Sequence, residues 1–288
     1  MKKIISLLIF FFLTVTVFAQ PFVDLMNLNS QVFNSTYKDS PKTRALVVDY
    51  NLTVFVPKQF KNGNTFLVRL AAEDLVVGRT EPYVNFRSLA LPIGFQFASK
   101  NKKWKWLLMG IPRYSGAKAV ILARGTRWGQ WGGTGLITYT INDSFKVKVG
   151  LFYNRECFGN FFVPLFGVDW KAGKRLSIYG ILPNNMRVEY KCAKNIYAGL
   201  GFKNYKRSYW LPEYHQADYV LVKETQFKCF IDFYTKAKVI LFADAGYMVQ
   251  YSFTPYYHYN PYILHAAFDS SMNSNFLFTV GLAYRMRE

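Results

Sequence analysis

The sequence predicts an all-β protein: a transmembrane, antiparallel up-and-down β-barrel of about 12 strands, in the range 10–14. Three observations lead to this prediction. The chain starts with an export signal, apolar and polar residues alternate along many short segments, and the last segment is itself such a strand. Together they are typical of barrels that Gram-negative bacteria export to their outer membrane.

The last segment is the most informative one. Between Phe276 and Met286 every second residue is apolar, and the positions between hold Leu277, Thr279, Gly281, Ala283 and Arg285. A two-residue period places the apolar set on one face of an extended strand. We therefore expect the barrel-assembly machinery to insert the protein through this strand. Outer-membrane strands usually end on an aromatic residue, whereas here Tyr284 is followed by Arg-Met-Arg-Glu.

The export signal is expected to be a cleaved peptide. Lys2 and Lys3 precede an apolar run that ends with small-residue cleavage chemistry at Ala19. The run is shorter than the roughly 20 residues of a spanning helix, so an uncleaved anchor is the weaker alternative. The expected division of the chain is a signal peptide at 1–19, an N-terminal segment that is either an edge strand or a plug at 20–43, and the barrel at 44–288.

Alternation recurs along the rest of the chain. Short links such as Asn142-Asp143 and Asn184-Asn185 are typical of tight turns between neighbouring strands. The expected strands lie at about 46–56, 66–70, 89–97, 104–114, 130–141, 145–154, 161–171, 175–181, 186–192, 196–204, 224–235, 239–251 and 276–286.

Alternation alone does not say which face points inward. A soluble secreted barrel buries its apolar face, whereas a membrane barrel turns that face to lipid. The strand number, the signal peptide and the aromatic content of 19% favour the membrane. Aromatic residues near segment ends would then form the girdles that contact lipid head groups; they are Trp104, Trp106, Trp128, Trp131, Trp170, Tyr209 and Trp210.

Three segments carry a family resemblance. They are Leu165–Trp170, Leu176–Lys191 and Ile196–Phe202, which contain an Asp-aromatic strand end, a Leu-Pro turn and a Glu-Tyr strand in this order. In these segments the chain resembles a family of uncharacterised bacterial outer-membrane β-barrel proteins, a domain of unknown function. The resemblance is sharpest over about 160–205. It implies the fold and the compartment, and it implies no catalytic residues.

Charged residues share one face of several expected strands. In Met186–Lys191 three charges alternate with three apolar residues, and a Lys or Arg on the lipid face costs roughly 2–4 kcal/mol at the midplane. These side chains should therefore face the lumen. The candidate lumen residues are Lys146, Lys148, Arg187, Glu189, Lys191, Lys228, Asp232 and Asp244. Such a lumen can conduct solutes, or ion pairs between its own side chains can close it. Inward side chains of Tyr179, Phe230 and Phe242 would favour the closed lumen.

The formal net charge of +19 has two explanations. Basic residues that line a pore would attract small anions. Alternatively, basic residues at loop bases would bind the phosphates of lipopolysaccharide, and Lys100–Lys103 and Lys203–Arg207 resemble such surface clusters. The expected partners are outer-membrane lipids and lipopolysaccharide. Nucleic acid is not an expected partner, because the protein is exported and its basic residues are dispersed. The oligomeric state stays open.

Two tyrosine-rich segments, 208–219 and 253–262, are expected to be extracellular loops. Aromatic rings in the second segment could stack on sugars, and more often such a cluster covers the barrel mouth. The candidate binding residues are Tyr256, Tyr257, His258, Tyr259 and Tyr262. The remote alternative is a lipid hydrolase, for which His265 near Asp269, Ser270 and Ser271 would be the starting point.

No catalytic residue, cofactor or metal is therefore expected. The chain has three cysteines, and none has the spacing of a metal ligand. The function predicted from the sequence is a porin-like passive channel for small anionic solutes. The alternative is a closed barrel with a structural, adhesive or ligand-binding role in the envelope.

Overall fold

The computed structural model describes residues 22–38, 42, 44–78, 84–117, 129–211, 218–256 and 271–287. The expected signal peptide at 1–19 lies outside the described residues. Most of the described chain is β-strand. None of these residues belongs to a helix that could span a lipid bilayer.

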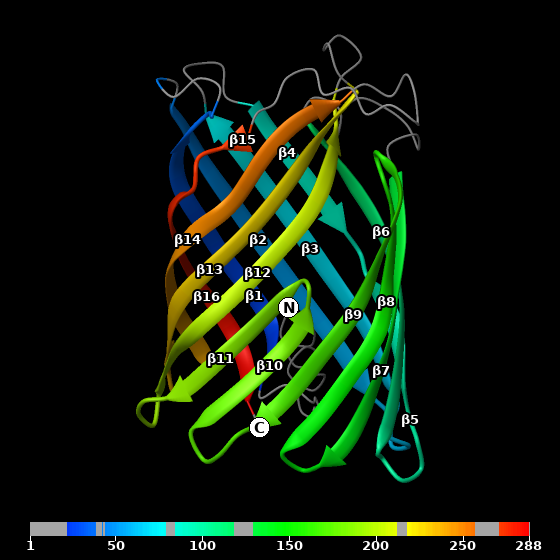
Figure 1. Ribbon diagram of the computed structural model, residues 1–288. Coiled ribbons are helices and arrows are strands. Elements are labelled where there is room, and N and C mark those ends of the chain that lie inside the picture. The colour runs from blue at the N-terminus through cyan, green and yellow to red at the C-terminus, as the bar shows by residue number, and fades with distance from the viewer. Residues whose placement is uncertain are drawn as a thin grey trace, which may run out of the picture.

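The strands follow one another around a single sheet (Figure 1). They are β1 (Phe22–Thr36), β2 (Arg44–Gln59), β3 (Thr65–Gly78), β4 (Val84–Ala90), β5 (Ile93–Ala98), β6 (Trp104–Ala117), β7 (Gly129–Asn142), β8 (Phe145–Glu156), β9 (Gly159–Lys171), β10 (Leu176–Leu182), β11 (Asn185–Lys191), β12 (Ile196–Trp210), β13 (Tyr219–Tyr234), β14 (Val239–Tyr256), β15 (Ser271–Met272) and β16 (Asn275–Arg287).

The sheet closes on itself. β16 pairs with β14 on one side and with β1 on the other, from Phe22↔Arg287 to Phe33↔Leu277. β4 and β5 both pair with β3 and β6, so they are two parts of one wall strand. β15 and β16 likewise pair with β14 one after the other, so they count as one wall strand. The result is an antiparallel barrel of 14 strands. The predicted fold class is confirmed, and the strand number is 14 rather than about 12.

The N-terminal segment 20–43, which the sequence predicts to be either an edge strand or a plug, contains β1. In β1, Asn27, Asn29 and Gln31 alternate with Met26, Leu28 and Val32. The polar set points to the barrel interior, where all three members line a cavity, and the apolar set is exposed on the outside. β1 thus joins the wall by the same alternation as its neighbours.

The two ends of the barrel differ. At the lower end of Figure 1, where β1 begins and β16 ends, turns of two to five residues join the strands. At the upper end, by contrast, the β1–β2, β6–β7, β12–β13 and β14–β15 connections are each longer than five residues. In outer-membrane barrels short turns are periplasmic and long loops are extracellular.

Apolar side chains cover the outer wall. Phe276, Phe278 and Val280 of the last strand are 58–66% exposed, whereas Leu277 and Thr279 between them are buried. The same outward pattern recurs on every long strand, for example at Leu108, Val149, Leu200 and Leu241. Alternation therefore places apolar groups outside and polar groups inside, which is the arrangement of a membrane barrel.

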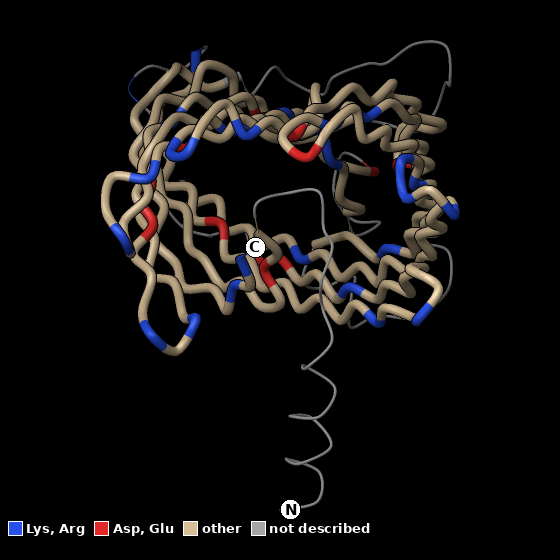
Figure 2. The backbone as a smooth tube through the Cα atoms, turned by 90° about the horizontal axis from the view of Figure 1, so that it is seen from below, with Lys and Arg blue, Asp and Glu red and all other residues tan. Residues whose placement is uncertain are grey.

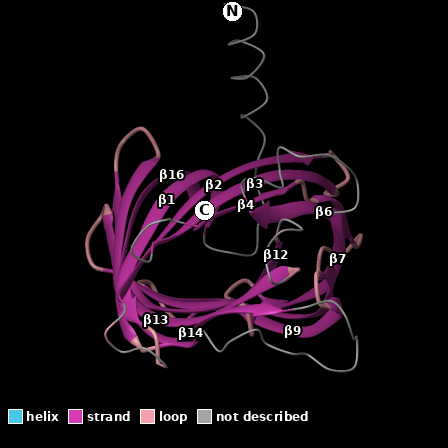
Figure 3. Cartoon of the chain, turned by 90° about the horizontal axis from the view of Figure 1, so that it is seen from above, coloured by secondary structure: helices cyan, strands magenta, loops and turns pink. Residues whose placement is uncertain are grey.

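The upper part of the interior is packed rather than hollow. There β12 and β13 lean across the barrel, and Trp210 of β12 forms a parallel bridge with Gly116 of β6 (Figure 3). One face of the β12–β13 hairpin packs in a core with Val47, Leu75 and Phe86 from the opposite wall. Its other face packs on the β8–β9 turn. Among the described residues, this apolar cluster, which we call the dry core, spans the upper barrel from the β12–β13 hairpin to the opposite wall.

Candidate functional site

A large interior space lies below this core. It is a cavity of about 630 Å³ inside the barrel, which we call the chamber. It is bounded by the inward faces of strands from β1 around to β16, and Figure 2 shows the barrel from its lower end. Amides supply many of its polar groups: Asn27, Asn29, Gln31, Asn51, Gln96 and Asn185.

The charges that line the chamber are mostly basic. The basic lining residues are Arg69, Lys105, Lys148, Arg187, Lys203 and Lys228, against the acidic Asp24 and Asp244. Several basic groups are neutralised by carboxylates behind the lining: Lys148 by Asp169 at 2.8 Å, Arg187 by Asp232 at 3.3 Å and Lys203 by Glu224 at 3.4 Å. A solute in the chamber therefore meets ammonium and guanidinium groups before it meets their partners.

Two lining residues differ from this pattern. Lys228 binds Asp244 at 2.6 Å, and both residues line the chamber. Arg69 is exposed and takes part in none of the ion pairs formed by the described residues. Arg69 is thus the chamber's most accessible cation.

A charge cluster fills one side of the lower barrel. Arg285 bonds Asp24 and Asp232, and Arg187 bonds Asp232 from the facing strand. Arg287 bonds Glu189. We call these six residues the Arg285 cluster. Because three basic and three acidic groups neutralise one another, the Arg285 cluster holds β1, β11, β13 and β16 together.

Aromatic rings complete the Arg285 cluster. The guanidinium of Arg285 lies 3.6 Å from the ring centre of Phe22, and that of Arg187 lies 3.6 Å from the ring centre of Phe230. Tyr179 donates to Glu189 at 3.1 Å. Tyr179 and Phe230 are buried and Phe242 lines the chamber, so all three aromatic side chains point inward. Part of the lumen is therefore filled.

A second cluster lies between the chamber and the dry core. Arg207 bonds Asp49 at 3.0 Å and Glu224 at 3.1 Å, and it also bonds Glu73. We call these four residues the Arg207 cluster. Tyr209 donates to Glu73 at 2.8 Å, which ties the cluster to the core above. The two clusters and the core occupy part of the lumen above and beside the chamber.

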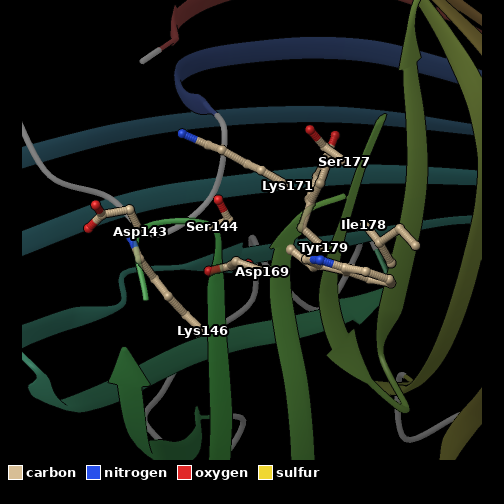
Figure 4. A pocket seen from close by; sticks show the side chains of 9 residues that line it. Asp143, Ser144, Lys146, Asp169, Lys171, Ser177, Ile178 and Tyr179 are labelled. Carbon is tan, nitrogen blue, oxygen red and sulfur yellow. The ribbon is translucent and has the colours of Figure 1, made fainter. Parts of the chain in front are cut away.

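The structure distributes the predicted lumen residues over three places. Lys148, Arg187, Lys228 and Asp244 line the chamber. Glu189 and Asp232 are buried in the Arg285 cluster. Lys146 and Lys191 are half-buried at the lower rim, where Figure 4 shows Lys146 with Asp143, Asp169 and Lys171 around a small crevice.

The predicted loop residues are mostly outside the described chain. Tyr256 is described, and its ring stacks on that of Tyr219 with centroids 5.5 Å apart. The remaining candidates lie outside the described residues: Tyr257, His258, Tyr259 and Tyr262 for binding, and His265, Asp269 and Ser270 for hydrolysis.

Two sequence interpretations are wrong. The Lys203–Arg207 segment is not a surface cluster, because Lys203 lines the chamber and Arg207 is buried. Tyr209 is not a girdle residue, since it is fully buried in the core. Both errors have one cause: β12 continues to residue 210 and leans inward, so side chains near the end of this strand point into the barrel.

The sequence reasoning also missed residues of both clusters. Six of them were not among the lumen candidates: Asp24, Asp49, Glu73, Arg207, Glu224 and Arg287. A signal did exist, because each is a charged residue at an inward position of an alternating strand. All three cysteines are free, and the described residues contain no group of His, Cys, Asp and Glu that could hold a metal ion.

Comparison with known families gives one match. The model of the family described as "Domain of unknown function (DUF6268)" matches residues 130–285, which is more than half of the chain. This confirms the resemblance to an uncharacterised barrel family. Among curated proteins none matches this chain.

Solved structures similar to this chain are outer-membrane proteins of low sequence identity. An outer membrane channel from Pseudomonas putida F1 is 8% identical, with a TM-score of 0.47 over 92% of this chain and 96% of that chain. The NanC porin is 8% identical, with a TM-score of 0.41 over 91% and 100%. The Pseudomonas putida toluene transporter TodX is 11% identical, with a TM-score of 0.39 over 90% and 88%.

Proposed function

The chain belongs to the DUF6268 family of unknown function, and from its own geometry we propose that it is an outer-membrane channel for small anionic solutes. The membrane assignment rests on the apolar outer wall. The wall strands also exceed the roughly 9–11 residues that a tilted strand needs to span a bilayer, except for the divided β4–β5 and the short β10 and β11. The lower end with its short turns would face the periplasm.

One observation carries the anionic specificity: the basic lining of the chamber. Charged groups in a cavity with low-dielectric walls focus their field on a solute inside, so a basic lining concentrates anions and repels cations. Arg69 and Lys228 are the residues that we expect to contact such a solute. The lipids around the barrel, including lipopolysaccharide, and the barrel-assembly machinery are the partners that this location implies.

Single-channel recording in a planar bilayer tests the proposal. The purified protein should give conductance steps with a chloride-to-potassium permeability ratio above one. Arg69→Gln and Lys228→Met should both lower that ratio, because each removes one cation from the lining. Lys100→Gln is the matched control, since Lys100 is an exposed lysine in the β5–β6 turn, outside the chamber. Folding of each variant is checked by heat-modifiable gel mobility.

A closed barrel is the second candidate function, and the dry core favours it. Leu75, Phe86 and Tyr209 are fully buried where an axial pore would have to pass. Absence of any conductance, in a preparation shown to be folded, would contradict the channel and support a structural or ligand-binding envelope barrel.

A further inference from the structure

Within the described residues, the wall of the barrel is incomplete between β9 and β12. The β10–β11 hairpin between them is short, with strands of seven residues each, whereas β9 and β12 extend above it (Figure 1). β9 pairs with β10 only from Phe166 downward, and β12 pairs with β11 only up to Lys203. Within the described chain, residues 159–165 of β9 therefore pair with β8 alone, and residues 205–209 of β12 pair with β13 alone.

Unpaired strand edges do not persist against hydrocarbon. Backbone groups at membrane depth are tolerated without partners only where they are buried in protein or line a water-filled space. Where side chains do not cover them, the two edges between β9 and β12 must accordingly be wet or be covered by a ligand. The sequence reasoning could not foresee this place, because it depends on how far each strand pairs.

Side chains bridge the two edges at the top of the gap. The ammonium of Lys206 lies 4.3 Å from the ring centre of Phe158 and 4.8 Å from that of Phe161. Above it, Ser208 accepts from the backbone N–H of Cys157 at 2.9 Å and donates to Glu156 at 2.6 Å. The gap is thus bounded above by these contacts, below by the β10–β11 turn, and on its sides by β9 and β12.

The chamber reaches this gap. Ile181 and Asn185, on either side of the β10–β11 turn, line the chamber together with Tyr205 of β12. Tyr205 lies at an inward position yet is 39% exposed, and its ring is 4.7 Å from the Lys203 ammonium. A group that enters beside Tyr205 would therefore meet the basic lining directly.

The chemistry of the rim and the lining identifies an occupant. Phe161, Val163 and Tyr205 give the opening an apolar and aromatic rim, and Lys206 carries a charge that takes part in none of the ion pairs among the described residues. An apolar rim before a basic chamber matches a molecule with an apolar chain and an anionic head. We propose that the chamber opens sideways to the membrane between β9 and β12, and that single-chain anionic amphiphiles pass through this lateral opening.

This inference rests on the proposed function in one respect: it gives the chamber a second entrance, through the wall, in addition to the path along the barrel axis. It also deepens the substrate class, from small anions to anions with an apolar chain. Phosphate, sulfate and carboxylate heads share the required charge, and a membrane lipid fragment or a free amphiphile could supply any of them.

The position of the opening is tested with a fluorescent label. The background is Cys192→Ser with Cys229→Ser, which removes the two exposed thiols and keeps the buried Cys157. In this background, bimane is attached to a single new cysteine: Tyr205→Cys, Leu200→Cys or Thr53→Cys. Each labelled protein is placed in a bilayer whose lipids carry spin labels on their acyl chains. Leu200 is 60% exposed on the outer wall, and Thr53 lines the chamber on another strand. We expect strong quenching at positions 200 and 205 and none at 53. Quenching at 205 as weak as at 53 would overturn the lateral opening.

The occupant is tested by equilibrium binding in neutral detergent, with dodecyl phosphate and inorganic phosphate as probes. Dodecyl phosphate should bind at least tenfold more tightly than inorganic phosphate. Val163→Trp, which fills the rim, should weaken dodecyl phosphate binding at least tenfold without changing inorganic phosphate binding. Val149→Trp on the outer wall is the matched control, because Val149 is 54% exposed there.

These readouts separate the two proposals. Equal affinity for both phosphates, or Val163→Trp binding dodecyl phosphate like the unaltered protein, would overturn the amphiphile inference even if the channel conducts. A silent channel that binds dodecyl phosphate in the predicted way would overturn the conductance of small anions and support the lateral site.

Discussion

The upper and lower halves of the barrel interior are built from the same strands but stabilised differently. The upper half is a dry core of apolar side chains with Tyr209 and Phe86 at its centre. The lower half holds the chamber and the Arg285 cluster, in which charged groups pair across the lumen. The Arg207 cluster forms the boundary between them.

The difference follows from how the wall is closed. In the lower half the wall strands pair around the full circle, so the opposite walls stay apart and water and charge can fill the space. In the upper half β12 leans onto β6, and the opposite walls come within packing distance. Apolar side chains at inward positions are then buried as in a β-sandwich, which adds hydrophobic stabilisation. The comparison predicts that substitutions cost more stability above the chamber than beside it.

The largest effect is expected at the boundary. Arg207→Ala removes the cation that the buried carboxylates of Asp49 and Glu224 share with the half-buried Glu73. Removal of one partner from a buried ion pair typically costs about 3–5 kcal/mol. We expect the variant to unfold at a clearly lower guanidinium concentration than the unaltered protein in the same detergent. Lys103→Ala, in an exposed turn, is the control and should leave the midpoint unchanged. Equal midpoints for both variants would mean that the Arg207 cluster does not join the two halves.

The next largest effect compares the stability of the two halves directly, with one Leu→Ala substitution in each. Leu75→Ala should cost about 2–5 kcal/mol, because Leu75 is fully buried in the dry core. Leu107→Ala, at an inward position that lines the chamber, should cost less, since the side chain already borders open space. The difference between the two unfolding free energies is the measurement. A larger cost for Leu107 would contradict the description of the lower half as hollow.

The difference between the two halves also explains which features of the structure could be predicted from the sequence. Alternation predicted the fold class, because a two-residue period decides which residues face outward whatever the tertiary details. It also placed Lys148, Arg187, Lys228 and Asp244 on inward faces. Alternation could not tell that inward positions near residue 207 meet an opposite wall while those near residue 187 border a cavity. That depends on strand lean and on pairing across the lumen, which no local pattern contains.

The strand count shows the same limit. The strand that was absent from the expected set is β1, where Ser30 interrupts the apolar set of an otherwise alternating segment. Arg285 and Arg287, which made the end of the chain look unusual, bond the acidic groups of Asp24, Asp232 and Glu189. A departure from the usual composition of a last strand is therefore explained by partners elsewhere in the sequence.

A smaller effect is expected where an inward aromatic ring packs over a glycine of the neighbouring strand. Phe242 pairs with Gly281, and a Cβ at position 281 would lie 2.6 Å from the carbonyl oxygen of Leu28. Gly281→Ala should therefore cost about 1–3 kcal/mol by overpacking. Gly110→Ala is the control, because the nearest atom to its Cβ would be 4.0 Å away. An unchanged unfolding midpoint for Gly281→Ala would show that the wall at the chamber adapts more freely than its geometry implies.

The smallest effect concerns the rim of the lower half. Lys191 is half-buried at the end of β11, and its ammonium lies 5.8 Å from the ring centre of Tyr197, near the limit for a favourable cation–π contact. Lys191→Ala should change stability by less than about 1 kcal/mol. It should also shift the anion-to-cation permeability ratio less than Arg69→Gln does, because Lys191 lies outside the chamber. Single-channel recordings of both variants under one salt gradient make the comparison. A larger shift for Lys191→Ala would place selectivity at the rim, and the basic lining of the chamber would then serve the fold alone.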